Sequence, residues 1–170
     1  KSLRPYFLFV GALKRGKNIP ALLGAFAKYN EESKKVYDLY LIGGDYWLDP
    51  AIGETIRRFS LQKRVRRFGV VSDEKLAALY RSATALVMPS LWEGFCLPVV
   101  EAMASGCPVI VSRAGALPEI VGDAGILVDP MNADETAYAM KKIKPNAKGR
   151  IRAKIFSWKL MAKTILELIK

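Results

Sequence analysis

The sequence predicts an α/β domain built on a doubly wound parallel sheet of about six strands. Two observations lead to this prediction. Short aliphatic runs alternate at regular intervals with amphipathic stretches, which is the pattern of repeated strand–helix–strand units. The aliphatic runs are apolar almost throughout, as expected for strands that are buried on both faces of a parallel sheet. Right-handed crossovers would then place the intervening helices on both faces of the sheet.

Six segments fit the strand pattern, and we expect each of them to be buried. They are Tyr6–Val10, Leu39–Ile42, Val65–Phe68, Ala85–Met88, Val109–Ser112 and Ile126–Val128. Ligands of such sheets bind beyond the carboxyl ends of the strands. The loops that follow the strands are therefore the places to look for a site, and they comprise residues 11–18, 43–50, 69–73, 89–97 and 113–118.

Helical periodicity lies between these strands and after the last one. The expected helices are Ile19–Tyr29, Ile52–Phe59, Glu74–Ser82, Pro98–Ser105, Glu135–Ile143 and Ser157–Ile169. Asp73 is a suitable N-cap for the third helix, and Pro98 suits the first turn of the fourth. The basic segment of residues 144–152 contains turn-forming residues, and we expect it to be a loop.

The composition indicates one globular domain. The chain has 170 residues, of which 51% are apolar and 25% charged, and this length suits a single hydrophobic core. The sequence does not begin with Met, so we expect it to be a piece of a longer protein. With two cysteines and no histidine, it offers neither a disulfide framework, nor a zinc site, nor a histidine-dependent catalytic triad. This cysteine usage predicts a reducing, cytoplasmic setting.

The positive charge is concentrated at the C-terminal end. The net charge is +11, and residues 141–170 carry ten basic residues and one acidic residue. Such a segment favours an acidic partner. One alternative is an anionic membrane surface, which would hold the protein peripherally at the inner membrane face, and the other is a further protein domain. We do not expect nucleic acid, because the aromatic residues are not interleaved with the basic ones.

The first loop differs by one residue from a phosphate-binding P-loop. The segment GALKRGKN follows a strand and precedes a helix, as that motif requires. Asn18, however, stands where the P-loop has a Ser or Thr that binds magnesium, so we expect neither an ATPase nor a metal site. Gly11 still allows close backbone approach, and Lys17 can place a positive charge on a phosphate. Alternatively, Lys17 is only a solvated surface lysine.

The fourth loop carries two carboxylates beside a helix N-terminus. Glu93 lies in the loop, and Glu101 lies about one turn into the following helix. A glycine at position 94 would free the backbone, and the helix dipole suits a diphosphate. The main-chain N–H groups that could then face a ligand are those of Gly94, Phe95, Cys96 and Leu97. Carboxylates accept hydrogen bonds from sugar hydroxyls, although both glutamates could simply favour an early helical turn.

This loop resembles the signature of a known enzyme family. Glu93 and Glu101, within the segment EGFCLPVVEAMA, are similar to the paired-glutamate motif of glycosyltransferase family 4, whose members are retaining enzymes of the GT-B fold. The similarity covers about residues 6–143. It implies that residues 1–170 form one Rossmann-like domain, the C-terminal half that binds the nucleotide-sugar donor. The N-terminal acceptor domain would lie outside this chain.

The resemblance also implies a role for individual residues. Glu93 would be the catalytic residue, contacting hydroxyls of the donor sugar and stabilising positive charge at its anomeric carbon, while Glu101 would hold the ribose hydroxyls. The remaining nucleotide-sugar-binding residues would be Gly11, Lys17, Val70, Val71, Gly94, Phe95, Cys96 and Leu97. The two valines would read the nucleobase through their backbone, and the others would neutralise the diphosphate. Stabilisation of this leaving group by fixed donors would be the main catalytic effect, without a metal or cofactor.

The predicted function is transfer of a hexosyl group, mannose or glucose, from a nucleoside-diphosphate sugar to a glycan or lipid-linked acceptor. The alternative is a non-catalytic module that binds a nucleotide sugar. Two residues depart from the family pattern. Ala12 stands where many members have arginine, so one phosphate contact is absent or comes from elsewhere. Cys96 stands where several members have glycine, which slightly narrows the pocket.

Overall fold

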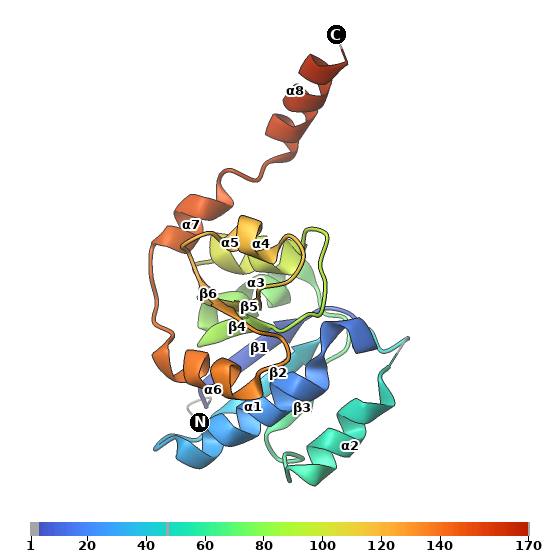
Figure 1. Ribbon diagram of the computed structural model, residues 1–170, viewed down its shortest axis with the longest axis vertical. Coiled ribbons are helices and arrows are strands. Elements are labelled where there is room, and N and C mark those ends of the chain that lie inside the picture. The colour runs from blue at the N-terminus through green and yellow to red at the C-terminus, as the bar shows by residue number, and fades with distance from the viewer. Residues whose placement is uncertain (1–3, 47, 170) are drawn as a thin grey trace.

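Six parallel strands form a single sheet between two layers of helices (Figure 1). The structure, a computed structural model, describes residues 4–46 and 48–169. The strands are β1 (Tyr6–Val10), β2 (Asp38–Ile42), β3 (Val65–Arg67), β4 (Ala85–Met88), β5 (Val109–Ser112) and β6 (Ile126–Val128). Their order in the sheet is β3-β2-β1-β4-β5-β6. This confirms the predicted fold class, a doubly wound Rossmann-like sheet.

The helices are divided between the two faces of the sheet (Figure 1). One layer holds α1 (Ile19–Glu32), α2 (Pro50–Arg58) and α6 (Ala133–Lys142). The other holds α3 (Asp73–Ser82), α4 (Leu97–Ala104), α5 (Leu117–Val121) and α7 (Lys148–Ala153). A short 3-10 helix, η1 (Arg15–Lys17), precedes α1. The strand order reverses between β1 and β4, so the loops that follow these two strands flank the topological switch point where such sheets bind ligands.

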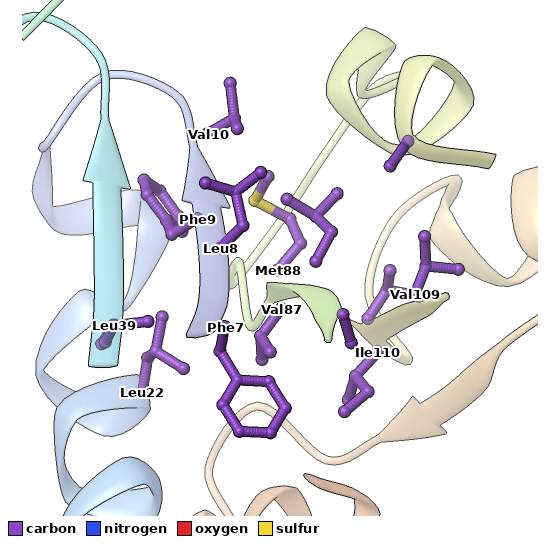
Figure 2. Close-up of a cluster of buried hydrophobic side chains, with 14 of the residues drawn as sticks. Phe7, Leu8, Phe9, Val10, Leu22, Leu39, Val87, Met88, Val109 and Ile110 are labelled. Atoms are coloured by element: carbon purple, nitrogen blue, oxygen red, sulfur yellow. The ribbon is translucent and has the colours of Figure 1, made fainter. Parts of the chain in front are cut away.

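The core lies on both sides of the central strands, as Figure 2 shows. Every residue of β1, β2, β4 and β5 is buried. Phe7, in the middle of the core, is paired in register with Leu39 on one side and Ala85 on the other. Its ring meets that of Tyr29 edge to face, with the ring centres 5.0 Å apart. Burial of a large apolar side chain of this kind stabilises a fold by about 1.5–3 kcal/mol, which explains why these segments form the centre of the sheet.

The expectation that every strand is buried is wrong for the two edge strands. In β6, Ile126 and Leu127 are only half-buried, and β3 is the more exposed of the two. This strand ends at Arg67, and both Arg66 and Arg67 are exposed. It pairs only with β2 and forms one edge of the sheet. Charged side chains on an edge strand oppose pairing with another chain, so the polar residues of β3 fit its position at the edge.

Two short helices lie where none is expected. The predicted loop at residues 144–152 contains α7, which packs against α4, and α5 follows the fifth strand. Segments of five or six residues show too little periodicity to be recognised, and packing supplies most of their stability. The N-cap of α3 is Ser72, whose hydroxyl accepts a hydrogen bond from the N–H of Lys75 at 3.4 Å, and Asp73 occupies the first turn instead.

The last helix, α8 (Trp158–Leu168), projects away from both layers (Figure 1). None of its residues is buried. Across the part of the chain that the structure describes, no helix combines the length and the apolar character that a membrane crossing needs.

Candidate functional site

Three glycines bring the carboxyl ends of β1, β2 and β3 into close contact. The N–H of Gly11 donates to the carbonyl of Ile42 at 2.9 Å, and the N–H of Gly43 donates to that of Gly69 at 2.8 Å. Gly43 has a φ of +140°, and a Cβ there would lie 2.1 Å from the carbonyl oxygen of Gly11. Only glycine allows this approach, and we call the strand ends at Gly11, Gly43 and Gly69 the glycine edge.

Lys17 and Glu93 form an ion pair across the switch point. The Lys17 Nζ donates to the Glu93 Oε1 at 2.6 Å, and the two side chains are only 16% and 12% exposed. The end of the Lys17 side chain lies over Gly11, with its Cε 3.5 Å from where a Cβ on that glycine would be. The reading of Lys17 as a solvated surface lysine is therefore wrong. The predicted phosphate-binding lysine directly contacts the predicted sugar-binding carboxylate.

The main chain around Glu93 is held by the loop that follows β5. The N–H of Ala116 donates to the carbonyl of Glu93 at 2.9 Å. Gly115, at a φ of +57°, approaches the same carbonyl so closely that a Cβ would lie 2.2 Å from its oxygen. Within the β4–α4 loop itself, the N–H of Leu91 donates to the carbonyl of Gly16 at 2.9 Å. The carboxylate is thus positioned by two other loops.

Asn18 has a structural role at the end of the first loop. It adopts a left-handed conformation with a φ of 55° before α1 begins. Its side-chain nitrogen donates to the carbonyls of Pro89 at 3.2 Å and Pro130 at 2.7 Å. The residue that replaces the P-loop Ser or Thr therefore joins the first loop to the ends of β4 and β6.

The start of α4 presents main-chain donors. The N–H groups of residues 94 to 97 donate no hydrogen bond to any protein group within residues 4–46 and 48–169. Unpaired N–H groups are usual at the start of a helix. The residue with a left-handed backbone is Cys96, at a φ of 72°, so the expectation that Gly94 provides the required freedom is wrong. Three of these residues have solvent-facing surface, namely Gly94, Phe95 and Leu97.

The side chain of Phe95 contacts the protein on one side of this loop. Its ring meets that of Phe156 edge to face, with centres 5.5 Å apart, so only its main chain is available for an anion. Val70 and Val71 lie elsewhere, after β3. Val70 is 79% exposed, and its Cγ2 lies 4.0 Å from where a Cβ on Gly44 would be. Val70 thus lies near Gly44, the residue that follows Gly43, and neither valine is part of the ion pair.

The second glutamate, Glu101, receives a hydrogen bond from a residue that was not among the predicted site residues. The hydroxyl of Tyr80, near the end of α3, donates to the Glu101 Oε2 at 3.0 Å. Tyr80 is 2% exposed, whereas Glu101 is exposed on α4. A tyrosine on the apolar side of an amphipathic helix is indistinguishable from a core residue at the level of sequence pattern.

The thiol of Cys96 lies within the electric field of both glutamates. Burial raises the pKa of this thiol to about 12, and the negative charges of Glu93 and Glu101 act in the same direction, while the positive charge of Lys17 opposes them. A thiol with this pKa remains protonated at neutral pH and is a poor nucleophile.

Comparisons with known proteins identify the family of the chain. Residues 4–145 match the family described as glycosyl transferases group 1. The chain is 37% identical over 161 residues to O-antigen chain mannosyltransferase B of Escherichia coli, covering 90% of this chain and 42% of that protein. It is 47% identical over 104 residues to MMP alpha-(1->4)-mannosyltransferase of Mycolicibacterium hassiacum, covering 54% of this chain and 25% of that protein.

Solved structures share the fold. Sucrose-phosphate synthase of Thermosynechococcus elongatus superposes with a TM-score of 0.83 at 31% identity, over 98% of this chain and 45% of that one. Anabaena HepE, in complex with UDP and glucose, gives a TM-score of 0.85 at 21% identity, over 98% and 48%. The chain spans less than half the length of these relatives. The matched family, the parallel sheet and these structures together show that the chain belongs to the glycosyl transferases group 1 family, with the fold of the C-terminal domain of a GT-B glycosyltransferase.

Proposed function

We propose that this chain is the donor-binding domain of a retaining glycosyltransferase that moves a hexosyl group from a nucleoside-diphosphate sugar to a glycan or lipid-linked acceptor. The observation that carries the proposal is the 2.6 Å ion pair between Lys17 and Glu93, beside the free N–H groups at the start of α4. Mannose or glucose is the transferred sugar that we propose, since relatives are named mannosyltransferases and a protein of the same fold holds UDP and glucose.

The proposed site binds two parts of the donor with groups of opposite charge. Lys17 and the main-chain donors of residues 94–97 would bind the diphosphate, because a fixed cation and the positive end of a helix both stabilise this anion. Glu93 would face the sugar, where a carboxylate stabilises the positive charge that develops at the anomeric carbon. The existing ion pair holds these two groups 2.6 Å apart before any donor arrives. When the bond between sugar and diphosphate breaks, Lys17 would then stabilise the leaving diphosphate and Glu93 the positive charge on the sugar, without a metal ion.

The ribose and the base would lie away from the ion pair. Glu101 would accept hydrogen bonds from the ribose hydroxyls, since an ionised carboxylate is a pure acceptor. The main chain of Val70 and Val71, beyond the glycine edge, would read the base. The acceptor would be bound by a further domain of the same protein. The existence of a further domain is supported by the relatives, because the chain covers less than half of their length.

Binding of nucleotides to the chain tests the first step. Isothermal titration calorimetry with UDP, GDP and ADP should give a dissociation constant below about 1 mM for at least one of them, equivalent to roughly −4 kcal/mol. No binding of any of the three at millimolar concentration would contradict the proposed site.

Sugar transfer by the complete protein tests the second step. Glu93→Gln keeps the size of the side chain but removes its charge, so we expect transfer to fall by about a hundredfold or more. Glu54→Gln is the matched control, because Glu54 is exposed on α2, and it should retain full activity. A complete protein that binds the donor but transfers nothing would instead be a non-catalytic nucleotide-sugar-binding module.

A further inference from the structure

Glu101 is an exposed acid on a helix, and Tyr80 is its hydrogen-bond partner. The Tyr80 hydroxyl donates to the Oε2 of Glu101 at 3.0 Å. The other carboxylate oxygen, Oε1, receives no hydrogen bond from the residues that the structure describes. A single buried donor therefore holds one oxygen of the carboxylate, and the second oxygen stays available to a ligand.

Such a contact matters because a free glutamate side chain is flexible. Fixing the rotamers of a glutamate side chain costs conformational entropy. A ligand that binds an unrestrained carboxylate must supply this free energy itself, whereas a carboxylate that is already oriented binds with less loss. The hydrogen bond from Tyr80 selects the orientation of Glu101 before the ligand arrives.

Tyr80 is well suited to this task because it is itself immobile. The residue is only 2% exposed, and burial together with the charge of Glu101 raises its pKa above the usual value, so its hydroxyl keeps its proton and remains a donor. The adjacent residue, Leu79, is fixed as well, because its carbonyl accepts a hydrogen bond from the Tyr6 hydroxyl of β1 at 2.8 Å. The last turn of α3 is thus attached to the central strand of the sheet.

We propose that Tyr80 is the positioning residue for ribose recognition: its phenol orients Glu101 so that the free carboxylate oxygen meets the ribose hydroxyls. This inference rests on the proposed function, because it assumes that Glu101 binds the ribose. It extends that function from α4 to α3, the helix that follows the Val70–Val71 loop. The base-reading loop and the ribose-binding acid would then be connected through one helix.

The experiment compares nucleotides that differ only in the ribose. The dissociation constants of the ribonucleoside diphosphate that binds best and of its 2′,3′-dideoxy form are measured by calorimetry for the wild-type chain and for variants. We expect the wild type to prefer the ribonucleotide, and Tyr80→Phe to reduce this preference about tenfold, as expected from loss of a hydrogen bond to a charged group. The dideoxy form should bind both proteins equally.

Two further variants separate positioning from a general effect on folding. Tyr6→Phe removes another buried phenol hydrogen bond from the same turn of α3 without touching Glu101, and it should keep the wild-type preference. In Glu101→Ala the preference should be lost, and adding Tyr80→Phe to it should change nothing more. This absence of an additive effect would show that Tyr80 acts through Glu101.

Each other outcome overturns the inference in a recognisable way. If the wild type prefers the ribonucleotide and Tyr80→Phe keeps that preference, the positioning role is wrong while the proposed function stands. If Tyr80→Phe weakens both nucleotides equally, its effect is on the fold and the positioning role is also wrong. If the wild type binds both nucleotides equally, Glu101 does not bind the ribose, and the proposed site fails together with the inference.

Discussion

Lys17 and Glu93 stabilise each other's charge in a partly buried setting. Replacing Lys17 with methionine keeps the apolar part of the side chain over Gly11 but leaves the carboxylate without its cation. We expect the Lys17→Met variant to bind nucleoside diphosphates at least about tenfold more weakly, because a hydrogen bond to a charged group contributes about 1.5–3 kcal/mol. Affinity for the uncharged nucleoside should be unchanged. Calorimetry with both ligands measures the difference.

The matched control for this prediction is Lys28→Met. Lys28 also forms a short ion pair, 2.7 Å from Asp134, but these two side chains are 44% and 72% exposed. Exposed pairs of this kind contribute little to stability, and the pair lies on α1 and α6. The control should bind both ligands as the wild type does. Equal weakening of nucleoside and diphosphate by Lys17→Met would mean that Lys17 acts on the fold and not on the phosphate.

The two buried thiols should make stability fall in alkaline solution. Burial raises the pKa of Cys96 and of Cys107 from 9.0 to about 12. Below pH 9 both thiols keep their protons in the folded and the unfolded chain, so their contribution is constant. Above pH 9 the unfolded chain releases protons that the folded chain retains, and the free energy of unfolding falls by up to about 1.4 kcal/mol per pH unit for each thiol.

Urea unfolding between pH 8 and pH 10.5 measures this effect. The Cys107→Ala variant has one buried thiol fewer, so its free energy of unfolding should fall less steeply with pH than that of the wild type. Identical slopes for the two proteins would show that the Cys107 thiol ionises in the folded state as easily as in the unfolded one.

At the scale of elements, the contact between α4 and α7 requires a small residue at position 149. A Cβ on Gly149, in α7, would lie 3.5 Å from atoms of Met103 in α4, which is ordinary contact distance. Gly149→Ala should therefore be tolerated, whereas Gly149→Leu should force the helices apart and lower the free energy of unfolding by about 1–3 kcal/mol. Chemical denaturation of the two variants provides the measurement. Similar stabilities would mean that α7 can shift without cost.

The strands of the fold could be predicted from sequence, whereas the shortest helices could not. The strands β1, β4, β5 and β6 lie within their predicted bounds, because an aliphatic run between turn residues has few alternatives. The burial of β3 was mispredicted, since Val65 opens a strand whose position at the edge depends on the strand order. The helix α7 escaped prediction because its stability comes from contacts such as that of Arg152, which donates to the carbonyl of Ile120 at 3.0 Å.

The candidate site, too, could be predicted only in part. The loops that contain Gly11, Lys17 and Glu93 could be identified from motifs, and the structure brings these residues together. The roles of Tyr80 and Asn18 could not be foreseen, because each depends on a partner more than 20 residues away in the chain, at 21 and 71 residues respectively. The left-handed backbone of Cys96 was also missed, because the nearby Gly94 is the residue that ordinarily favours this conformation.

At the scale of the whole molecule, the C-terminal helix offers an uncovered apolar face. Trp158, Met161, Ile165 and Leu168 recur at helical spacing on α8 and are all exposed. The polar side of the helix includes Lys159 and Lys163, within the basic segment at residues 141–170. A basic amphipathic helix of this kind is suited to an anionic membrane surface. Docking on a further domain remains the alternative prediction.

Co-sedimentation with liposomes distinguishes these two predictions. The chain should bind vesicles that contain anionic lipid, and binding should weaken as salt is raised because the attraction is screened. The double variant Lys159→Gln/Lys163→Gln should bind about 30-fold more weakly, at roughly 1 kcal/mol for each lysine near the surface. Zwitterionic vesicles are the control. Absence of binding would favour docking on another domain, and binding that does not respond to salt would rule out electrostatic attraction as its cause.

The two hydrogen bonds of Asn18 restrict which side chain can occupy this position of the first loop. Its amide nitrogen carries two hydrogens, and both point at carbonyl oxygens, those of Pro89 and Pro130. Aspartate has the same shape, but it would set a lone pair against each carbonyl and turn two attractions into two repulsions. A serine would be too short to reach both. The ends of β4 and β6 are therefore joined through a single amide nitrogen, a donor that neither aspartate nor serine would supply to both carbonyls.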